Sequence, residues 1–179
     1  GLDLVVNVLL FIALAQHGPW PLAVAGLVVL TVVLSYDFNA EALYRSAWVE
    51  GHRSAEPVAV TAQPERPSLA LRLFKGLYDA VLAPQDRAIR GLDAALFRAA
   101  TGEGYGEAAD VQRRAWSNLA STGALVNLGL STQYLILGIC AVAGAPFAYV
   151  YIVLAQGVYV AAVQVTRVAV ARRHKSVAV

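Results

Sequence analysis

Residues 115–166 read AWSNLASTGALVNLGLSTQYLILGICAVAGAPFAYVYIVLAQGVYVAAVQVT, and this stretch contains no Asp, Glu, Lys or Arg. A soluble helix keeps a polar face toward water, whereas a charge inside a bilayer is costly, so the stretch indicates membrane-spanning helices. Gly144 and Pro146 interrupt it with turn-forming residues. The flanking segments, 122–143 and 147–170, each reach the roughly 20 residues that cross a bilayer, and together they predict a helical hairpin.

A second uncharged block lies between Asp3 and Asp37 and is interrupted at residues 17–21, which read HGPWP. Its halves, 4–16 and 22–36, are shorter, and they suffice to span if the turn lies in the interfacial zone. Over the whole chain 58% of residues are hydrophobic and 15% are charged, against about 25% charged in soluble domains. We therefore predict an all-α, polytopic membrane protein with four transmembrane helices in two hairpins, residues 1–36 and 122–171.

Residues 37–121, between the hairpins, predict an amphipathic helical insertion. Residues 37–52 could extend the second span as a helix, whereas 53–67 contain three prolines and are typical of a linker. Apolar residues then recur at helical spacing in 69–82 and again in 84–98. These helices could pack on each other and on the spans, or lie in the membrane interface. Acidic and basic residues alternate along them, which favours packing.

The basic residues indicate how the chain is oriented. Ten of the 14 lysines and arginines lie in residues 37–121, the other four lie at or beyond Arg167, and neither hairpin turn contains one. Positive charge concentrates on the cytoplasmic side of a membrane protein. We therefore predict that both termini and the central insertion are cytoplasmic, with residues 172–179 forming a basic tail.

Few residues form a group that could carry out chemistry. The three histidines are scattered and Cys140 is the single cysteine, so no metal-binding spacing appears. Asp3 and Asn7 lie four residues apart and share one face of a helix. Their oxygens could bind a hard cation such as Mg²⁺. Alternatively, Asp3 is a favourable charge at a helix N-terminus and Asn7 is a polar contact between spans.

Arg167 lies about one helical turn inside the cytoplasmic end of the fourth predicted span. Its guanidinium could bind a phosphate or a lipid headgroup, or its long side chain could extend toward water. The sequence supports both interpretations. Membrane lipids are the expected partners, and no feature of the chain indicates a nucleic-acid partner.

The layout resembles a known family. Asp3-x3-Asn7 at the start of the first span, residues 78–87 (YDAVLAPQDR) and residues 129–134 (GLSTQY) are similar to bacterial CDP-alcohol phosphatidyltransferases with an enlarged cytoplasmic insertion. That family has six transmembrane helices and the signature Asp-x2-Asp-Gly-x2-Ala-Arg-x8-Gly-x3-Asp-x3-Asp, which ends in the third helix. The chain resembles the C-terminal four-helix portion, with the first half of the motif absent.

The resemblance implies a function in phospholipid synthesis in a bacterial inner membrane. Such an enzyme moves a substituted phosphate from a CDP-alcohol to an acceptor hydroxyl and releases CMP, and the family's aspartates hold Mg²⁺ ions that orient the diphosphate. Asp3 matches the third aspartate, a metal ligand. Asn7 matches the fourth, associated with the general base, and an amide cannot accept a proton near neutral pH. Homodimer formation is a further implication.

Two hypotheses remain for the function. In one, the chain is a phosphatidyltransferase whose first two helices are missing from this sequence, and the lack of an initiator methionine favours this view. On its own, such a chain is incomplete or inactive. In the other, it is a non-catalytic structural or accessory transmembrane subunit of a larger membrane complex, and the asparagine at position 7 favours that view. The DNA directly upstream would distinguish them.

Overall fold

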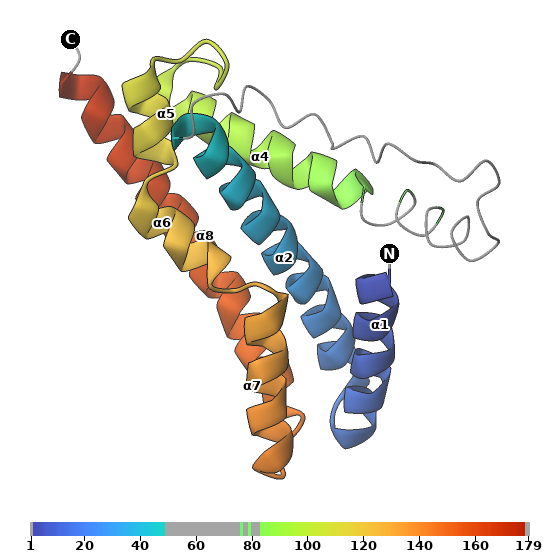
Figure 1. Ribbon diagram of the computed structural model, residues 1–179. Helices are drawn as coiled ribbons and strands as arrows, with labels where there is room; N and C mark the ends of the chain where they lie inside the picture. The colour runs from blue at the N-terminus through green and yellow to red at the C-terminus, as the bar shows by residue number, and fades with distance from the viewer. Residues whose placement is uncertain (1, 49–75, 77–78, 80–82, 178–179) are drawn as a thin grey trace.

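The computed structural model describes residues 2–48, 76, 79 and 83–177, and the regular elements in these ranges are all helices (Figure 1). The all-α prediction is confirmed for this part of the chain. The predicted linker 53–67 and nearly all of segment 68–82 lie outside the described residues.

The first hairpin consists of α1 (Leu2–Leu14), a short 3-10 helix (Ala15–His17) and α2 (Trp20–Trp48). Pro21 lies in the first turn of α2, where its missing N–H group would have no intrahelical partner. Gly18 lets the turn approach the second hairpin, because a Cβ there would lie 2.7 Å from ring carbons of Phe147. Beyond Tyr36, α2 continues without a break to Trp48, so the second span and the start of the insertion form one helix.

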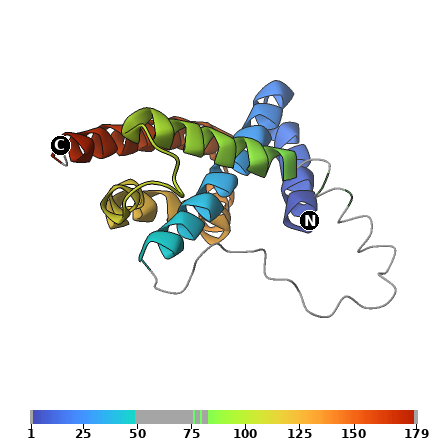
Figure 2. The same ribbon diagram turned by 90° about the horizontal axis from the view of Figure 1, so that it is seen from above.

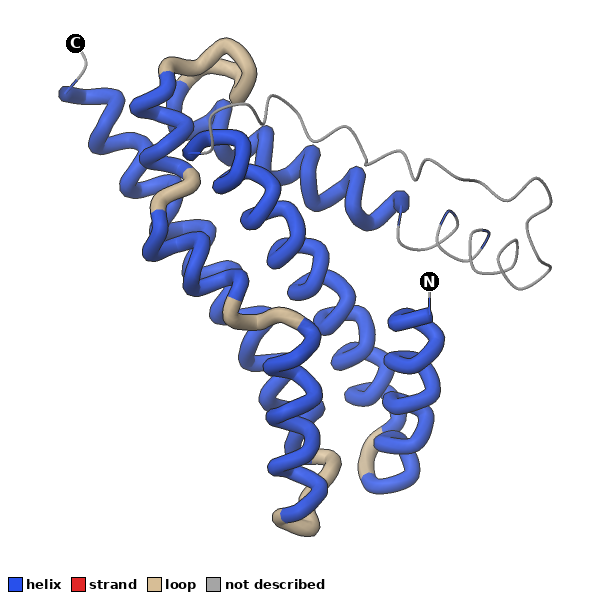
Figure 3. The backbone as a smooth tube through the Cα atoms, viewed as in Figure 1, coloured by secondary structure: helices blue, strands red, loops and turns tan. Residues whose placement is uncertain are grey.

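The second hairpin consists of α6 (Leu119–Val126), α7 (Leu130–Val142) and α8 (Ala148–Val177). Segment 122–143, expected as one helix, is interrupted at residues 127–129 between α6 and α7 (Figure 3). Asn118 caps α6 by accepting a 2.9 Å hydrogen bond from the Ser121 N–H group. Gly144 forms the turn before α8 with a φ of 72°, a conformation that favours glycine.

Helices α2 and α8 form the centre of the bundle and pack directly against each other (Figure 1). Their contact is close, since a Cβ on Gly157 would lie only 2.7 Å from a methyl carbon of Val29. The fully buried apolar side chains of this core come from both helices: Leu30, Val33, Tyr149, Val150 and Val153.

Helix α4 (Ala83–Thr101) lies across this pair, and α5 (Asp110–Trp116) packs beside α8. Seen from above, α4 crosses α2 and follows α8 (Figure 2). It buries one face, on which Ile89, Asp93 and Phe97 recur at a spacing of four. Helix α4 therefore packs on the long helices, which is the first of the two arrangements considered for the amphipathic segments.

Three helical segments are long and apolar enough to cross a membrane: Trp20–Trp48, Asp110–Val142 (which includes α5, α6 and α7) and Ala148–Arg173. The apolar helix Asp3–His17 is shorter. Large apolar side chains such as Leu9, Val28, Leu135, Ile139 and Val158 are exposed on the outer faces of these segments, as a lipid environment requires. The membrane prediction is confirmed in this form, and the fourth span remains a prediction.

Candidate functional site

A buried ion pair joins the central insertion to α8. Arg167 Nη1 donates a 2.7 Å hydrogen bond to Asp93 Oδ1. The two residues are only 2% and 3% exposed. Buried charges are stable only when they are paired and hydrogen-bonded, so this contact holds α4 and α8 in one arrangement.

Trp116 completes the surroundings of the pair. Its indole Nε1 donates to Asp93 Oδ2 at 3.1 Å, and its backbone carbonyl accepts from Arg167 Nε at 3.1 Å. The Arg167 guanidinium also lies over the indole ring, with Cζ 4.3 Å from the ring centroid, which is a cation–π contact. Three helices, α4, α5 and α8, thus meet at one polar centre, which we call the Asp93–Arg167 centre.

The sequence pointed to Arg167 but not to its partner. Arg167 was expected to bind a phosphate or extend toward water, whereas in this structure its guanidinium donates to protein groups. Asp93 lies in segment 84–98, which was expected to be an amphipathic helix. Its spacing of four from both Ile89 and Phe97, which places it in the apolar stripe of α4, was the available signal.

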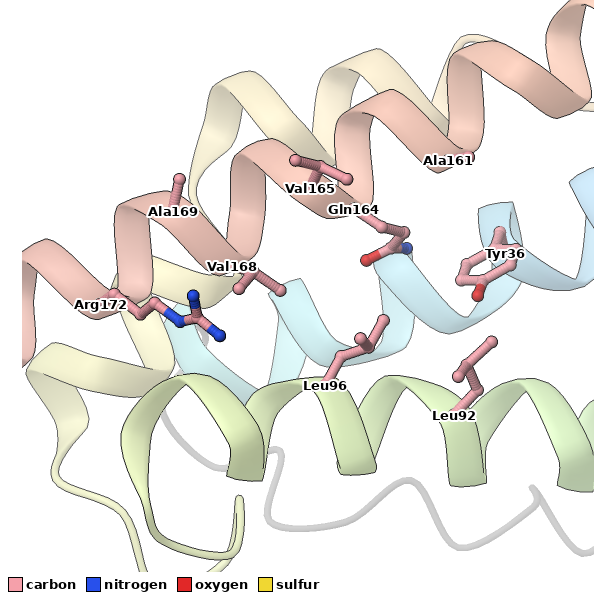
Figure 4. Close-up of a pocket in the computed structure, with 9 residues that line it drawn as sticks. All are labelled: Tyr36, Leu92, Leu96, Ala161, Gln164, Val165, Val168, Ala169 and Arg172. Carbon is pink, nitrogen blue, oxygen red and sulfur yellow. The ribbon is translucent and has the colours of Figure 1, made fainter.

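Gln164 extends the centre toward a cavity. Its Oε1 accepts a 3.0 Å hydrogen bond from Arg167 Nη1, while its Nε2 has no hydrogen-bond partner within the described residues. The cavity, of about 500 Å³, lies between α4 and α8 and reaches Tyr36 on α2. Figure 4 shows Leu92 and Leu96 pointing from α4 into this space and Arg172 reaching into it from α8.

Asp3 and Asn7 lie in the first two turns of α1, but their environments differ. Asp3 is exposed, whereas Asn7 is 2% exposed and its Oδ1 has no hydrogen-bond partner in the part of the chain that the structure describes. The pair offers one carboxylate and one buried amide. Among the described residues, no group of three or more His, Cys, Asp or Glu side chains could hold a metal ion. These donors do not fit a two-Mg²⁺ centre, and we derive no chemical step through that metal.

A second buried polar network lies deeper in the bundle. Gln133 Nε2 donates to Gln156 Oε1 at 2.9 Å and to the Leu128 carbonyl at 2.8 Å, and Gln133 Oε1 accepts from the Tyr149 hydroxyl at 3.3 Å. The Leu128 carbonyl is exposed by the break between α6 and α7, so Gln133 satisfies a backbone group that has left the helical ladder.

The chain was also compared with known proteins. No protein-family model, no curated protein and no solved structure matches it. The function is therefore inferred from the residues themselves.

Proposed function

We propose that this chain is the membrane-embedded four-helix portion of a phospholipid-synthesis enzyme of the CDP-alcohol phosphatidyltransferase type, incomplete or inactive on its own. The reaction is transfer of a substituted phosphate from a CDP-alcohol to an acceptor hydroxyl, with release of CMP. The observation that carries the proposal is the position of Asp3 and Asn7 at the start of α1, where the buried Asn7 Oδ1 has no partner among the described residues. In this proposal α1 is a fourth span and the termini and residues 37–121 are cytoplasmic, in a bacterial inner membrane.

The chemistry of the two residues limits what this chain can do. Asn7 can accept a hydrogen bond from a substrate hydroxyl and position it, but its amide cannot remove the proton. Asp3 supplies a single negative charge at the same end of α1. Positioning without a base leaves the nucleophile weak, so the chain is expected to bind and orient more than to catalyse.

The reading frame upstream of Gly1 provides the first test. The proposal predicts that it encodes Asp-x2-Asp-Gly-x2-Ala-Arg at the spacing of the signature. A start codon directly before Gly1 would overturn the proposal.

The second test is CMP release from CDP-diacylglycerol, measured with Mg²⁺ in liposomes for the product of the whole reading frame. Asp3→Asn is expected to lower the rate by about 100-fold or more, because it removes the negative charge that Asp3 places at the reacting end of α1. Glu107→Gln, which removes an exposed carboxylate from the loop after α4, is the matched control and should leave the rate unchanged. Equal rates for the two variants would contradict the role of Asp3.

The second candidate is a non-catalytic structural or accessory subunit of a membrane complex, with membrane lipids and a second copy or another subunit as partners. The amide at position 7, where the enzyme family has an acid, favours it. An Asn7→Asp version of the whole product distinguishes the two functions. Continued absence of CMP release in that variant and in its parent would favour the structural function.

A further inference from the structure

The cavity between α4 and α8 has a polar group whose orientation is determined by its neighbour. A guanidinium only donates hydrogen bonds, so the Gln164 amide must present its oxygen to Arg167. Its NH₂ group is therefore directed away from Arg167, and it has no partner in the described ranges although Gln164 is only 6% exposed. Because an unsatisfied buried donor is costly, this group points to a ligand with an acceptor oxygen.

The walls of the cavity are apolar and its outer end is basic. Leu92 and Leu96 of α4 lie opposite Val168 of α8 (Figure 4), and Val165 also lines the space. Arg172, an exposed residue about two turns beyond Gln164, lies at the end nearer the C-terminus (Figure 4). From the C-terminal end of α8 inward, the cavity therefore presents the Arg172 cation, then apolar walls, then the unsatisfied Gln164 NH₂ group.

This order matches the position of the cavity along the membrane-spanning helix. Residues 115–166 carry no charge, and Arg172 belongs to the basic region that follows them. A ligand in the cavity therefore has its anionic group beside the basic region and its apolar part toward the uncharged stretch, which is the order of headgroup and acyl chain in a lipid.

We propose that the cavity between α4 and α8 binds one anionic glycerophospholipid. Its phosphate pairs with Arg172, an ester carbonyl accepts from Gln164 Nε2, and an acyl chain lies along Leu92 and Leu96. Free phosphate would use the arginine but leave the apolar walls uncovered, so the lipid is the occupant that satisfies both ends. This lipid site does not rest on the proposed transferase function, because the cavity contains neither Asp3 nor Asn7.

Two neighbouring alanines allow a matched test. Ala161 and Ala162 are both exposed on α8, and only Ala161 lines the cavity. Ala161→Trp fills the inner end of the cavity, while Ala162→Trp adds the same bulk outside it. Ala169→Trp, at another exposed lining position, provides a second blocking variant should the first fail to fold.

The measurement is native mass spectrometry of the full chain in a mild non-ionic detergent, titrated with phosphatidylglycerol, phosphatidylcholine or inorganic phosphate. The parent is expected to retain one phosphatidylglycerol per chain, and both blocking variants should weaken binding by about tenfold or more while Ala162→Trp does not. Arg172→Gln should weaken phosphatidylglycerol binding by about tenfold or more, the effect of one charge-assisted hydrogen bond, and Arg173→Gln should not.

Three results would overturn the proposal. Equal retention of phosphatidylglycerol by the blocking variants and by Ala162→Trp would place the lipid elsewhere. If the parent bound phosphatidylcholine as tightly as phosphatidylglycerol, Arg172 would not select an anionic headgroup. Displacement of the lipid by inorganic phosphate at matched concentration would show that the apolar walls contribute nothing. None of these measurements depends on CMP release, so failure of the lipid site is distinguishable from failure of the proposed function.

Discussion

Replacing Asp93 with leucine is expected to destabilise the protein strongly. The variant leaves the Arg167 guanidinium buried at 2% exposure without the carboxylate that lies 2.7 Å away, and it also removes the acceptor of the Trp116 indole N–H group. Breaking a buried ion pair in this way costs about 3–5 kcal/mol, because one charge remains uncompensated. Arg167→Leu is expected to cost a similar amount, since Asp93 then keeps only the Trp116 hydrogen bond.

The double variant distinguishes pairing from simple loss of packing. With both Asp93 and Arg167 replaced by leucine, no charge is left buried, and the Trp116 indole N–H, the Trp116 carbonyl and Gln164 Oε1 lose their partners at about 1 kcal/mol each, a remaining cost of about 3 kcal/mol. The two single costs sum to at least about 6 kcal/mol, so a coupling free energy of about 3 kcal/mol or more is expected from the cycle.

The assay is reversible unfolding in mixed micelles, followed by tryptophan fluorescence, with melting temperatures as a second measurement. A loss of about 3 kcal/mol should lower the melting temperature by roughly 6–12 °C for a chain of this size. Glu41→Gln, which breaks the exposed Arg45–Glu41 pair of α2, is the control and should cost at most about 1 kcal/mol. Additive single and double costs, or an Asp93→Leu cost no larger than that of the control, would refute the reasoning.

Two further predictions concern packing and orientation. Gly157→Ala is expected to lower the free energy of unfolding by about 1–3 kcal/mol, because its Cβ would lie 2.7 Å from a methyl carbon of Val29. Gly138→Ala, whose Cβ would have nothing within 4 Å, should be neutral or stabilising by up to about 1 kcal/mol. Chemical unfolding of both variants measures this difference, and equal effects would contradict the close contact between α2 and α8. In a cysteine-free background, a cysteine at Ala145 in the hairpin turn should react with an impermeant thiol reagent from the periplasmic side and one at Ala109 only after the membrane is opened. Labelling of both from the same side would refute the predicted orientation.

The uncharged blocks determined the membrane-spanning character and the hairpin turns from sequence alone, because the bilayer imposes a local requirement. A helix in lipid must be apolar along its own length, so a membrane-spanning helix can be recognised from its own residues, whatever the distant parts of the chain contain. The turns at Gly18 and Gly144 are also predicted locally, because glycine and proline stand close together at both positions.

Only the tertiary structure decided where the polar groups go. At the break at residues 127–129, Gln133 donates to the freed Leu128 carbonyl, and Gln133 is itself held by Gln156 and Tyr149 of the distant helix α8. Asp93 and Arg167 are 74 residues apart, and either could equally have faced water. Their pairing arises because α4 packs across α2 and α8 and removes both from solvent at once, which leaves each as the other's strongest available partner.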